Sequence, residues 1–393
     1  MTLRRKLKVA IIGSGIGGLT AMRALRQRGF EVDIYERAQS LGEVGAGLQI
    51  GPNAYKVLRA LGLEHSLRNA AFEPKSRIVL NWNDASLRGR GAMNGEDIAR
   101  FGGRYMTAHR ADLHAMLQEG LPECNIHLGQ HCVSVGARGG AGYARFVGGG
   151  EIEADIVVGA DGIRSIVREV LFGADKPRFT NSMCWRCILP MSKLPARVGP
   201  GGSITLTPGD HLSWYGPAGQ VICYPLGDGS RLNIFAGHVS DKWVEESWST
   251  PSSSEELVAA YAGWNEALLG MFAESGDCYK WGIFDRDPRK HWTVGRVTLL
   301  GDAAHPTMPN LAQGANMAIE DGYVLARALD RYEEDVSTAL TQYVAERQPR
   351  TAQITLQSRE NFRRTREWPP APPLDRSWIF EFDATQEPER SAP

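Results

Sequence analysis

A glycine-rich turn between an apolar run and an amphipathic stretch constrains the fold of this chain most strongly. Residues 9–12 read Val-Ala-Ile-Ile, the turn reads Gly13-Ser14-Gly15-Ile16-Gly17-Gly18, and residues 19–28 have the apolar spacing of a helix. In such a strand, turn and helix, Gly13 permits the turn, Gly15 lets backbone amides approach a pyrophosphate, and Gly18 lets the helix pack close to the strand. The helix N-terminus adds partial positive charge. The segment therefore predicts a Rossmann-like dinucleotide-binding fold.

A second predicted strand, residues 32–35, ends at the acidic residue Glu36. A carboxylate about twenty residues beyond the glycine turn can accept hydrogen bonds from the ribose hydroxyls of an adenosine. The glycine pattern alone is a weak signal, but strand, helix and Glu36 stand in the expected order. We therefore expect the adenosine half of a dinucleotide at this place.

Two later segments repeat the pattern of a buried strand that ends in a glycine turn. Residues 154–165 contain Asp161-Gly162, and residues 297–306 contain Gly301-Asp302 followed by His305-Pro306. The first of these is also compatible with an ordinary tight turn before a helix. At a strand end, the Asp302 carboxylate can hydrogen-bond the ribityl hydroxyls of a flavin. The ordered set of three segments points to a flavin enzyme.

The Gly314-Ala315-Asn316 region that follows can start a helix aimed at the flavin ring. Its backbone amides would stabilise negative charge on a reduced flavin or on a peroxide. An amphipathic helix is expected at about residues 317–329, and a polar helix reaches about residue 366.

With Thr107-Ala108-His109-Arg110-Ala111-Asp112-Leu113-His114 between the first two segments, the chain resembles the single-component FAD-dependent aromatic hydroxylases, the group A flavoprotein monooxygenases. The resemblance is nearest to salicylate, 3-hydroxybenzoate and 6-hydroxynicotinate hydroxylases and covers roughly residues 8–345. It implies FAD as cofactor, NADH or NADPH and O2 as co-substrates, and a small hydroxylated aromatic or heteroaromatic acid that reacts with a C4a-hydroperoxyflavin. Because water would waste that oxidant as H2O2, a dry pocket is required.

The resemblance also implies which residues contact the cofactor. Arg110 would contact the flavin, the turn at Asp161 would serve both FAD and the visiting nicotinamide, and the backbone near Cys132 would lie by the adenine. The stretch 45–52 would line the flavin ring. Motifs and resemblance together place these residues at the cofactor: Gly13, Gly15, Ile16, Gly18, Glu36, Arg37, Gly47, Gln49, Arg110, Cys132, Asp161, Asp302, Gly314, Ala315 and Asn316.

A second nucleotide fold for the nicotinamide is not indicated. The later glycine clusters, at 139–142 and 148–150, flank a predicted strand and are typical of hairpin turns. We therefore expect NAD(P)H to visit without a domain of its own. The family implies a flavin that swings between a solvent-side position and a buried one.

The residues that activate the substrate ring are the next question. A phenolate is far more nucleophilic than a phenol, so a base or hydrogen-bond relay near the hydroxyl would speed the reaction. In the hydroxylases that the chain resembles, a His often stands on the strand before a Tyr-Pro turn, but here Gln220 precedes Tyr224-Pro225. Asn310 and Gln49 likewise replace a His or another polar group. We predict that Tyr224, Gln220 and Asn310 line the reacting ring, with Tyr224 as the acid/base or hydrogen-bonding candidate.

For several other side chains in this region, the sequence allows more than one role. Arg186 is a weak candidate for holding a substrate carboxylate. His305 is expected to fix the flavin loop, whereas His211 and His238 are expected to be ordinary surface or satisfied histidines. The candidates for the substrate pocket are Trp214, Tyr215, Ile222, Phe235 and Pro309. For the aromatic residues among them, a place in the hydrophobic core agrees with the sequence at least as well.

Composition excludes several other classes of protein. The 393 residues are 42% hydrophobic, enough for a large core, and the net charge of −1 gives no field for nucleic acid or anionic lipid. No apolar run approaches the ~20 residues of a membrane span, and the N-terminus does not read as a signal peptide. We expect a cytoplasmic protein with no nucleic-acid or membrane partner, and a homodimer is compatible with it.

Six cysteines are scattered along the chain, and one pair, Cys184 and Cys187, has a metal-like spacing. That pair lies in a predicted extended segment, where such side chains point to opposite faces. Because no second pair completes a zinc site, we expect no metal centre.

The chain is therefore predicted to be a mixed α/β protein with interleaved domains. A Rossmann-like FAD-binding domain takes residues 1–72, 106–180 and 285–345. An antiparallel-sheet substrate-binding domain takes 73–105 and 181–284, and a C-terminal helix and tail take 346–393.

The main hypothesis is an aromatic hydroxylase, and three alternatives remain open. One is a flavin monooxygenase that hydroxylates or epoxidises a larger polycyclic or heterocyclic product, which needs a wider pocket. Another is a flavin-binding redox sensor without turnover. The third is a flavin oxidase or dehydrogenase, which its substrate would reduce without nicotinamide.

Overall fold

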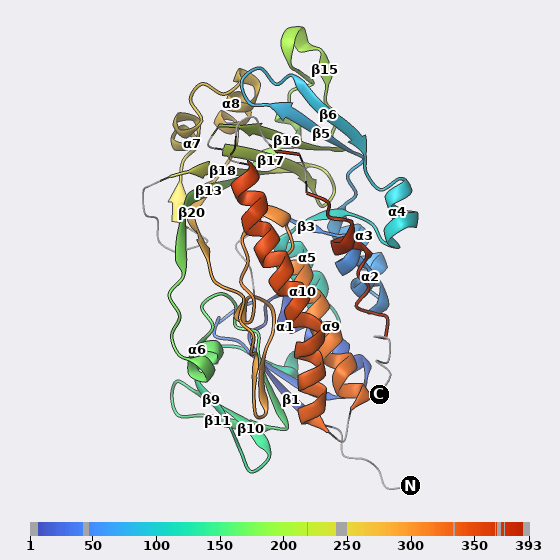
Figure 1. The fold of residues 1–393 in the computed structure, drawn as a ribbon, viewed down its shortest axis with the longest axis vertical. Helices are drawn as coiled ribbons and strands as arrows, with labels where there is room; N and C mark the ends of the chain where they lie inside the picture. The colour runs from blue at the N-terminus through green and yellow to red at the C-terminus, as the bar shows by residue number, and fades with distance from the viewer. Residues whose placement is uncertain are drawn as a thin grey trace.

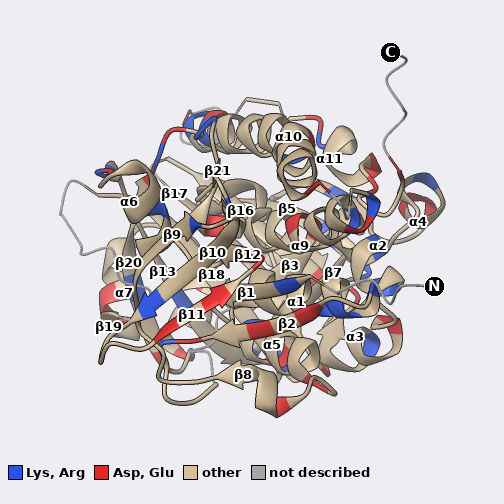
Figure 2. Cartoon of the chain, turned by 90° about the horizontal axis from the view of Figure 1, so that it is seen from below, with Lys and Arg blue, Asp and Glu red and all other residues tan. Residues whose placement is uncertain are grey.

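The computed structural model describes residues 7–41, 47–217, 219–240, 250–332, 335–365, 367, 371–372 and 374–387. Two units built on β-sheets lie one above the other, and a long helix, α10 (Val336–Thr365), extends along both (Figure 1). In the cartoon of Figure 2, the positions of Lys and Arg and those of Asp and Glu are interspersed among the elements rather than gathered in one region.

The lower unit in Figure 1 is built on a six-stranded sheet with apolar central strands. β1 (Lys8–Ile12) pairs in parallel with β2 (Glu31–Tyr35) and β12 (Ile156–Gly159), and β12 pairs in parallel with β22 (Val297–Leu299). The short edge strands are β8 (Ile126–His127), which is parallel, and β21 (Thr293–Val294), which is antiparallel. Because parallel strands end at one edge, the three glycine turns after β1, β12 and β22 converge there.

Helices cover this sheet and connect its strands. The glycine turn leads directly into α1 (Ile16–Gln27), which packs against α9 (Gly314–Arg331), so both predicted helices are confirmed. The other helices of this part are α2 (Pro52–Ala60), α3 (Glu64–Ala70), α4 (Glu96–Phe101), α5 (Arg110–Gln118) and α6 (Ile166–Phe172). A small antiparallel sheet joins β3 (Gly47–Ile50), β7 (Met106–His109) and β4 (Ala71–Phe72).

The predicted hairpins at the two later glycine clusters are confirmed. β9 (Cys132–Arg138), β10 (Ala141–Phe146) and β11 (Glu151–Ala154) form an antiparallel meander. Residues 139–140 turn the chain between β9 and β10, and residues 148–150 turn it between β10 and β11. Neither cluster is a second nucleotide-binding turn.

The upper unit is an eight-stranded sheet in the order β19-β20-β13-β18-β17-β16-β5-β6. One departure from the predicted antiparallel sheet is that β16 pairs in parallel with β5, which comes from the early part of the chain. The strands are β5 (Ser76–Asn81), β6 (Leu87–Ala92), β13 (Arg178–Pro190), β16 (Asp210–Gly216), β17 (Gly219–Leu226), β18 (Arg231–Val239), β19 (Thr250–Ser252) and β20 (Cys278–Asp285).

The two faces of this sheet have different environments. One face packs against α7 (Ser254–Ala260) and α8 (Glu266–Ala273) in an apolar core that contains Trp214, Val221 and Cys223. Because side chains alternate along a strand, the neighbours of these residues occupy the opposite face. The pair β14 (Arg197–Val198) and β15 (Ile204–Thr205) forms a separate small sheet.

Helix α10 ends at Thr365, close to the predicted end at about residue 366. Pro349 lies inside the helix and lacks the N–H that would bond four residues back. The C-terminal segment docks on α2: α11 (Ser377–Glu381) buries Ile379, and the Lys56 ammonium donates to the Phe380 carbonyl oxygen at 3.1 Å. Part of the proline-rich stretch before α11, residues 368–370 and 373, lies outside the described residues.

A fully buried ionic network joins α9 to α10. The Arg347 guanidinium contacts Glu320 at 2.6 Å and Asp321 at 2.7 Å, and none of the three side chains is exposed. Arg350 binds Glu320 through two hydrogen bonds of 2.9 Å. Burial acts to raise the pKa of Asp321, but the charges of His305 and Arg347, together with their hydrogen bonds to this carboxylate, lower it to about 2.

Replacing Arg347 should therefore cost much more stability than replacing an exposed arginine of the same helix. Arg347→Ala leaves two buried carboxylates under-compensated, so we expect a loss of about 3–5 kcal/mol in the free energy of unfolding, measured by urea denaturation. Arg363→Ala, whose partners Glu360 and Glu367 lie on the surface, should change it little. Equal losses in the two variants would contradict this role of the network.

Candidate active site

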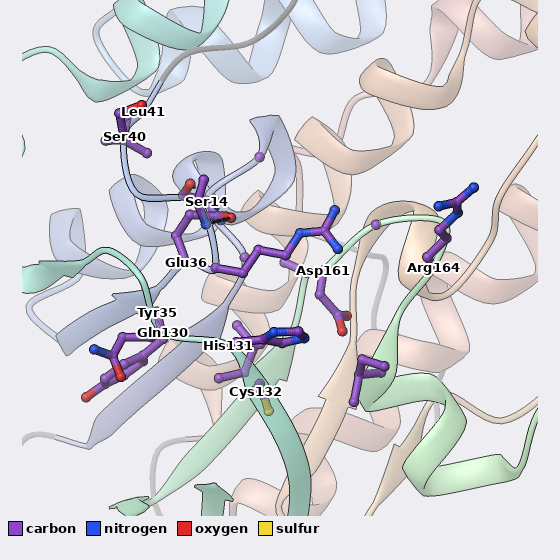
Figure 3. A pocket seen from close by; sticks show the side chains of 18 of the residues that line it. Ser14, Tyr35, Glu36, Ser40, Leu41, Gln130, His131, Cys132, Asp161 and Arg164 are labelled. Atoms are coloured by element: carbon purple, nitrogen blue, oxygen red, sulfur yellow. Dashed lines mark hydrogen bonds between the residues drawn. The ribbon is translucent and has the colours of Figure 1, made fainter. Parts of the chain in front are cut away.

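A cleft of about 320 Å³ opens at the carboxyl ends of β1, β2 and β12. Glu36, Cys132, Asp161 and Arg164 lie around it, from three separate segments of the chain (Figure 3). The expected cofactor residues that line this cleft are Gly13, Gly15, Glu36, Arg37, Cys132 and Asp161. The structure thus brings together the first two glycine motifs.

An added side chain would meet different surroundings at three glycines of the turn. Gly13 has φ +107°, and a Cβ there would lie 2.5 Å from the Ala160 carbonyl oxygen. A Cβ on Gly18 would lie 2.1 Å from the Gly13 oxygen, so the helix could not pack against the turn. A Cβ on Gly15 would meet no protein atom within 4 Å. Gly15 is therefore not needed for packing, which fits a close approach by a bound phosphate.

The Glu36 carboxylate closes the turn from the end of β2. It accepts hydrogen bonds from the Ser14 amide at 2.9 Å and the Ser14 hydroxyl at 3.0 Å, and its second oxygen accepts from the Ala38 amide at 2.9 Å. These bonds fix the carboxylate at the cleft wall, where a ribose could reach it. Burial raises the pKa of the neighbouring Cys132 thiol to about 11, so that thiol is inert in the cleft.

Asp161 of the second glycine motif both holds the start of a helix and lines the cleft. The Asp161 carboxylate accepts from the Ser165 hydroxyl and from the Val167 amide at 3.1 Å, so it caps α6 as well as lining the cleft. Sequence reasoning missed Arg164, His131 and Gln130, which also line it. The one available signal was that Arg164 directly follows the glycine turn.

A second group of predicted residues meets where the flavin ring would lie. Asp302 follows β22, and burial raises its pKa while the charges of His305 and Arg110 lower it. Gly314 is the first residue of α9, and a Cβ added to it would lie 3.9 Å from an Asp302 side-chain oxygen. The Asp302 turn, Arg110 and the start of α9 are thus close enough to serve one ligand.

Other residues predicted near the ring make hydrogen bonds and packing contacts that hold separate segments of the protein together. The Asn316 side chain accepts from the Gly51 amide at 2.8 Å and donates to the Gln49 carbonyl at 2.9 Å. Gly47 is required for packing, since a Cβ there would lie 2.5 Å from Asn233, whose side-chain oxygen accepts from the Gly47 amide. Residues 45 and 46, also expected at the ring, lie outside the described residues.

His305 has the structural role that was expected. Its Nε2 lies 2.5 Å from an Asp321 oxygen, and the same oxygen accepts from the Gly301 amide at 3.0 Å. The buried network thereby holds the turn that carries Asp302.

The sheet face opposite α7 and α8, and the 3₁₀ turn that carries Asn310, hold buried polar atoms with no hydrogen-bond partner in the described structure. They include the side-chain amide of Asn310, the Nδ2 of Asn233, the Nε of Arg77 and both ring nitrogens of His211. Buried polar groups are nearly always paired, and each unpaired one costs about 1–3 kcal/mol. Their concentration between the sheet and the flavin region indicates a ligand site.

Two of the three predicted catalytic residues meet at one end of this face. Gln220 and Asn310 line a cavity of about 10 Å³ together with Phe235, and Phe362 of α10 also lines it. Pro309 precedes Asn310 in the same 3₁₀ turn, Pro309–Leu311. The structure therefore brings Gln220, Asn310, Phe235 and Pro309 together.

Tyr224 lies further along the same face of β17, beside Gln49 and Tyr105. The Tyr105 hydroxyl donates to the side-chain oxygen of Gln49, and the Gln49 side chain also hydrogen-bonds Tyr224. Burial raises the pKa of both tyrosines, while the charge of Arg186 opposes that rise at Tyr224. Tyr105 is thus a site residue that sequence reasoning missed.

Two sequence predictions need correction. Trp214 was expected to wall the substrate, but it is fully buried in the core on the α7–α8 side of the sheet. Tyr215 and Ile222 have the opposite strand phase and face the site. His211 was expected to be a surface or satisfied histidine, but it is 3% exposed and neither ring nitrogen has a partner in the described region.

The two cysteines with metal-like spacing are oriented as predicted. Cys184 and Cys187 point to opposite faces of β13, into two different apolar clusters. Among the residues that the structure describes, no group of three or more His, Cys, Asp or Glu could hold a metal ion. No helix in that part of the chain is long and apolar enough to cross a membrane.

Together, the glycine cradle, the ribose-side carboxylate and the Asp302 turn define a flavin-binding oxidoreductase fold. The FAD binding domain family matches residues 6–358. The chain belongs to this family and, within it, to the FAD-dependent aromatic hydroxylases that its motifs resemble.

Known proteins of this kind are similar over nearly the whole chain. A 3-amino-4-hydroxybenzoate 2-monooxygenase of Streptomyces platensis is 37% identical over 96% of each chain. The 6-hydroxynicotinate 3-monooxygenase of Pseudomonas fluorescens is 33% identical over 97% of this chain and 96% of its own. The structure of a salicylate hydroxylase substrate complex has a TM-score of 0.78 at 25% identity and covers 96% of this chain and 92% of that one.

The steric analysis predicts that Gly15→Ala separates cofactor binding from folding. Because the added methyl group meets no protein atom, the variant should fold with near-normal stability, yet the methyl group would occupy the approach of the pyrophosphate. We expect the Kd for FAD, measured by fluorescence titration, to rise at least about tenfold, or 1.4 kcal/mol. Gly270→Ala, at another open position in α8, is the control; equal FAD affinity in both variants would refute this role.

The buried state of His211 predicts a pH-dependent stability. Burial, followed by the charge of Arg77, lowers its pKa to about 3, whereas an unfolded histidine titrates near about 6.5. The unfolded state therefore binds a proton that the folded state does not as pH falls from about 6.5 towards 3, and stability is lost over that window. Between pH 6 and 5, urea unfolding of the native protein should lose up to about 1.4 kcal/mol per pH unit more than His211→Asn. Parallel pH profiles would show that His211 is not buried neutral.

Proposed function

We propose that this protein uses NAD(P)H and O2 to hydroxylate a hydroxylated aromatic or heteroaromatic acid. The observation that carries the proposal is the set of buried, unpartnered polar atoms on the sheet face that looks toward the Asp302 turn and the start of α9. A substrate placed there would lie between those groups and the flavin. The family membership supports the same chemistry.

The residues present fit FAD, with the glycine cradle and Glu36 suited to its adenosine and pyrophosphate and the Asp302 turn suited to its flavin. When bound, FAD would take a hydride from NAD(P)H and deliver one oxygen atom of O2 to an aromatic carbon. The chain's own contribution is to orient the ring and exclude water. Tyr224, Gln220 and Asn310 are the proposed orienting groups, since the first two lie on that sheet face and Asn310 lines a cavity with Gln220.

A one-ring acid is favoured over a larger polycyclic substrate. The cavity lined by Gln220, Asn310, Phe235 and Phe362 is only about 10 Å³, roughly the space of one water molecule. Any substrate therefore requires side chains to move, and a single ring requires the smaller movement. The similar proteins named above act, by name, on an aminohydroxybenzoate and on hydroxynicotinate. The larger-substrate alternative would require Phe362 to move aside.

The proposal is tested by aerobic oxidation of NADH and NADPH with the FAD-loaded protein. The substrates are salicylate, 3- and 4-hydroxybenzoate, 3-amino-4-hydroxybenzoate and 6-hydroxynicotinate, with benzoate as the control that lacks a hydroxyl group. We expect at least one hydroxylated acid to stimulate oxidation at least about tenfold over benzoate, because benzoate lacks the hydroxyl group that the buried polar atoms would orient at the reacting centre.

Product and H2O2 are quantified together in that experiment. A hydroxylated product confirms the activity and names the substrate, whereas oxidation without any hydroxylated product, or no stimulation by any acid, contradicts the proposal. Anaerobic reduction of the flavin by the aromatic compound without nicotinamide would favour an oxidase or dehydrogenase instead.

A further inference from the structure

His211 on β16 is a buried histidine placed directly opposite Tyr224 on β17. Leu212 pairs with Cys223 in the strand register, so the next pair along is His211 and Tyr224, on the face away from the core. Their rings stack with centroids 5.7 Å apart and planes 14° apart. Because both imidazole nitrogens lack a partner in the described structure, the ring has one stacked contact and two unused polar atoms.

His211 and Gln220 lie on neighbouring strands, β16 and β17, and on the same face of the sheet. In the hydroxylases that the chain resembles, a histidine often occupies the place of Gln220, four residues before the tyrosine and on the same face of that strand. Here Gln220 lies at the cavity with Asn310, and the imidazole is supplied from β16. The site therefore keeps one imidazole beside the tyrosine but takes it from a different strand.

Positively charged groups face this imidazole, and no carboxylate is among the charges that act on it. Arg77 of β5 is its register partner, and the buried Nε of Arg77 has no partner in the described structure. Arg376, which precedes α11, is the second charge acting on His211. The other titratable side chains that share these interactions are Tyr105 and Tyr215, which carry hydroxyl groups rather than carboxylates.

The neighbouring carboxylate in sequence, Asp210, is engaged on the other side of the strand. It accepts from the Ser76 hydroxyl and from the Thr207 amide at 2.6 Å. It therefore does not neutralise the two arginines. Two cations beside a neutral imidazole in a buried place form a site that an anionic ligand would complete.

We propose that His211 accepts the phenolic proton of the substrate, and that Arg77 and Arg376 bind the substrate's carboxylate next to it. This inference rests on the proposed function. The O–H bond of the phenol breaks, its electron pair stays on the phenolate oxygen, and the proton forms an N–H bond on the imidazole. With carboxylate and phenolate bound, two negative charges face three positive ones, so the ionised state is better compensated than in the free site.

The two arginines make the basicity of His211 depend on the substrate. In the free protein, burial and then the charges of Arg77 and Arg376 hold the His211 pKa low. A bound carboxylate offsets these two charges and raises the proton affinity of the imidazole. A phenol without a carboxylate would leave the charges in place, so the site should ionise it less readily.

Arg186 is the other buried arginine on this face and provides a comparison. It lies on β13, with its guanidinium 4.4 Å from the centre of the Trp281 ring. Its charge acts on Tyr224 and on Arg110, on the flavin side, and it is not among the charges that act on His211. If Arg186 held the carboxylate instead, its replacement would weaken binding of the acid and that of Arg376 would not.

The proton transfer is tested with 4-hydroxy-3-nitrobenzoate, a chromogenic phenol, bound to the FAD-loaded protein without NAD(P)H. The yellow phenolate band is followed by difference spectroscopy as a function of pH. We expect the proton dissociation constant of the bound phenol to be at least about tenfold smaller in His211→Asn than in the native protein. His65→Asn, on the exposed surface of α3, is the matched control and should not change it.

The carboxylate site is tested with the same probe and with 2-nitrophenol, which lacks the carboxylate. Arg376→Met should weaken binding of the nitrobenzoate at least about tenfold and change that of 2-nitrophenol by less than about twofold. Equal effects on the two probes, or the selective loss in Arg186→Met instead, would overturn the assignment of the arginines.

The two proposals can fail separately. Native ionisation of the bound probe in His211→Asn would overturn the role of His211 even if hydroxylation is observed. Conversely, if no aromatic acid is hydroxylated but His211→Asn still lowers the ionisation of the bound probe, the proposed function fails and the proton acceptor stands. The FAD affinity of each variant is measured in parallel, and a loss of cofactor in His211→Asn would assign it a structural role.

Discussion

The buried ion pairs between α9 and α10 are the interaction on which the arrangement of the site depends. Asp321 receives the Gly301 amide and His305 as well as Arg347, so it fixes the turn that presents Asp302. Its neighbour Glu320 accepts from Asn53 of α2 at 2.6 Å. Because an isolated charge is prohibitively costly in such surroundings, these segments hold one another in a single arrangement.

The cofactor side of the molecule could be predicted from the sequence because its signals are contiguous. The glycine turn, Glu36 and the Asp161 and Asp302 turns each combine a buried strand with a chemically specific residue at its end. Parallel strands then bring those ends to one edge without further information. The assignment of Cys184 and Cys187 to opposite faces succeeded for the same local reason, since alternation within a strand needs no partner.

The substrate side could be predicted only in part, because it depends on strand phase and on pairing between distant segments. Trp214 and Tyr215 are adjacent in one strand, so they could not both line a pocket, and only the register decides which faces inward. The surroundings of His211 come from β5, β17 and the segment before α11. No local pattern around residue 211 reports neighbours that lie so far apart in the chain.

Helix α10 contributes Phe362 to the cavity lined by Gln220 and Asn310, although this helix belongs to neither sheet. Ser358 donates to the Met308 carbonyl at 2.7 Å and Asn361 to that of Asn310 at 2.9 Å, which places Phe362 against the cavity. The helix is anchored far from there, by Arg347 and Arg350. A change of the side chain at 362 would therefore reshape this cavity without altering a strand or the cofactor cradle.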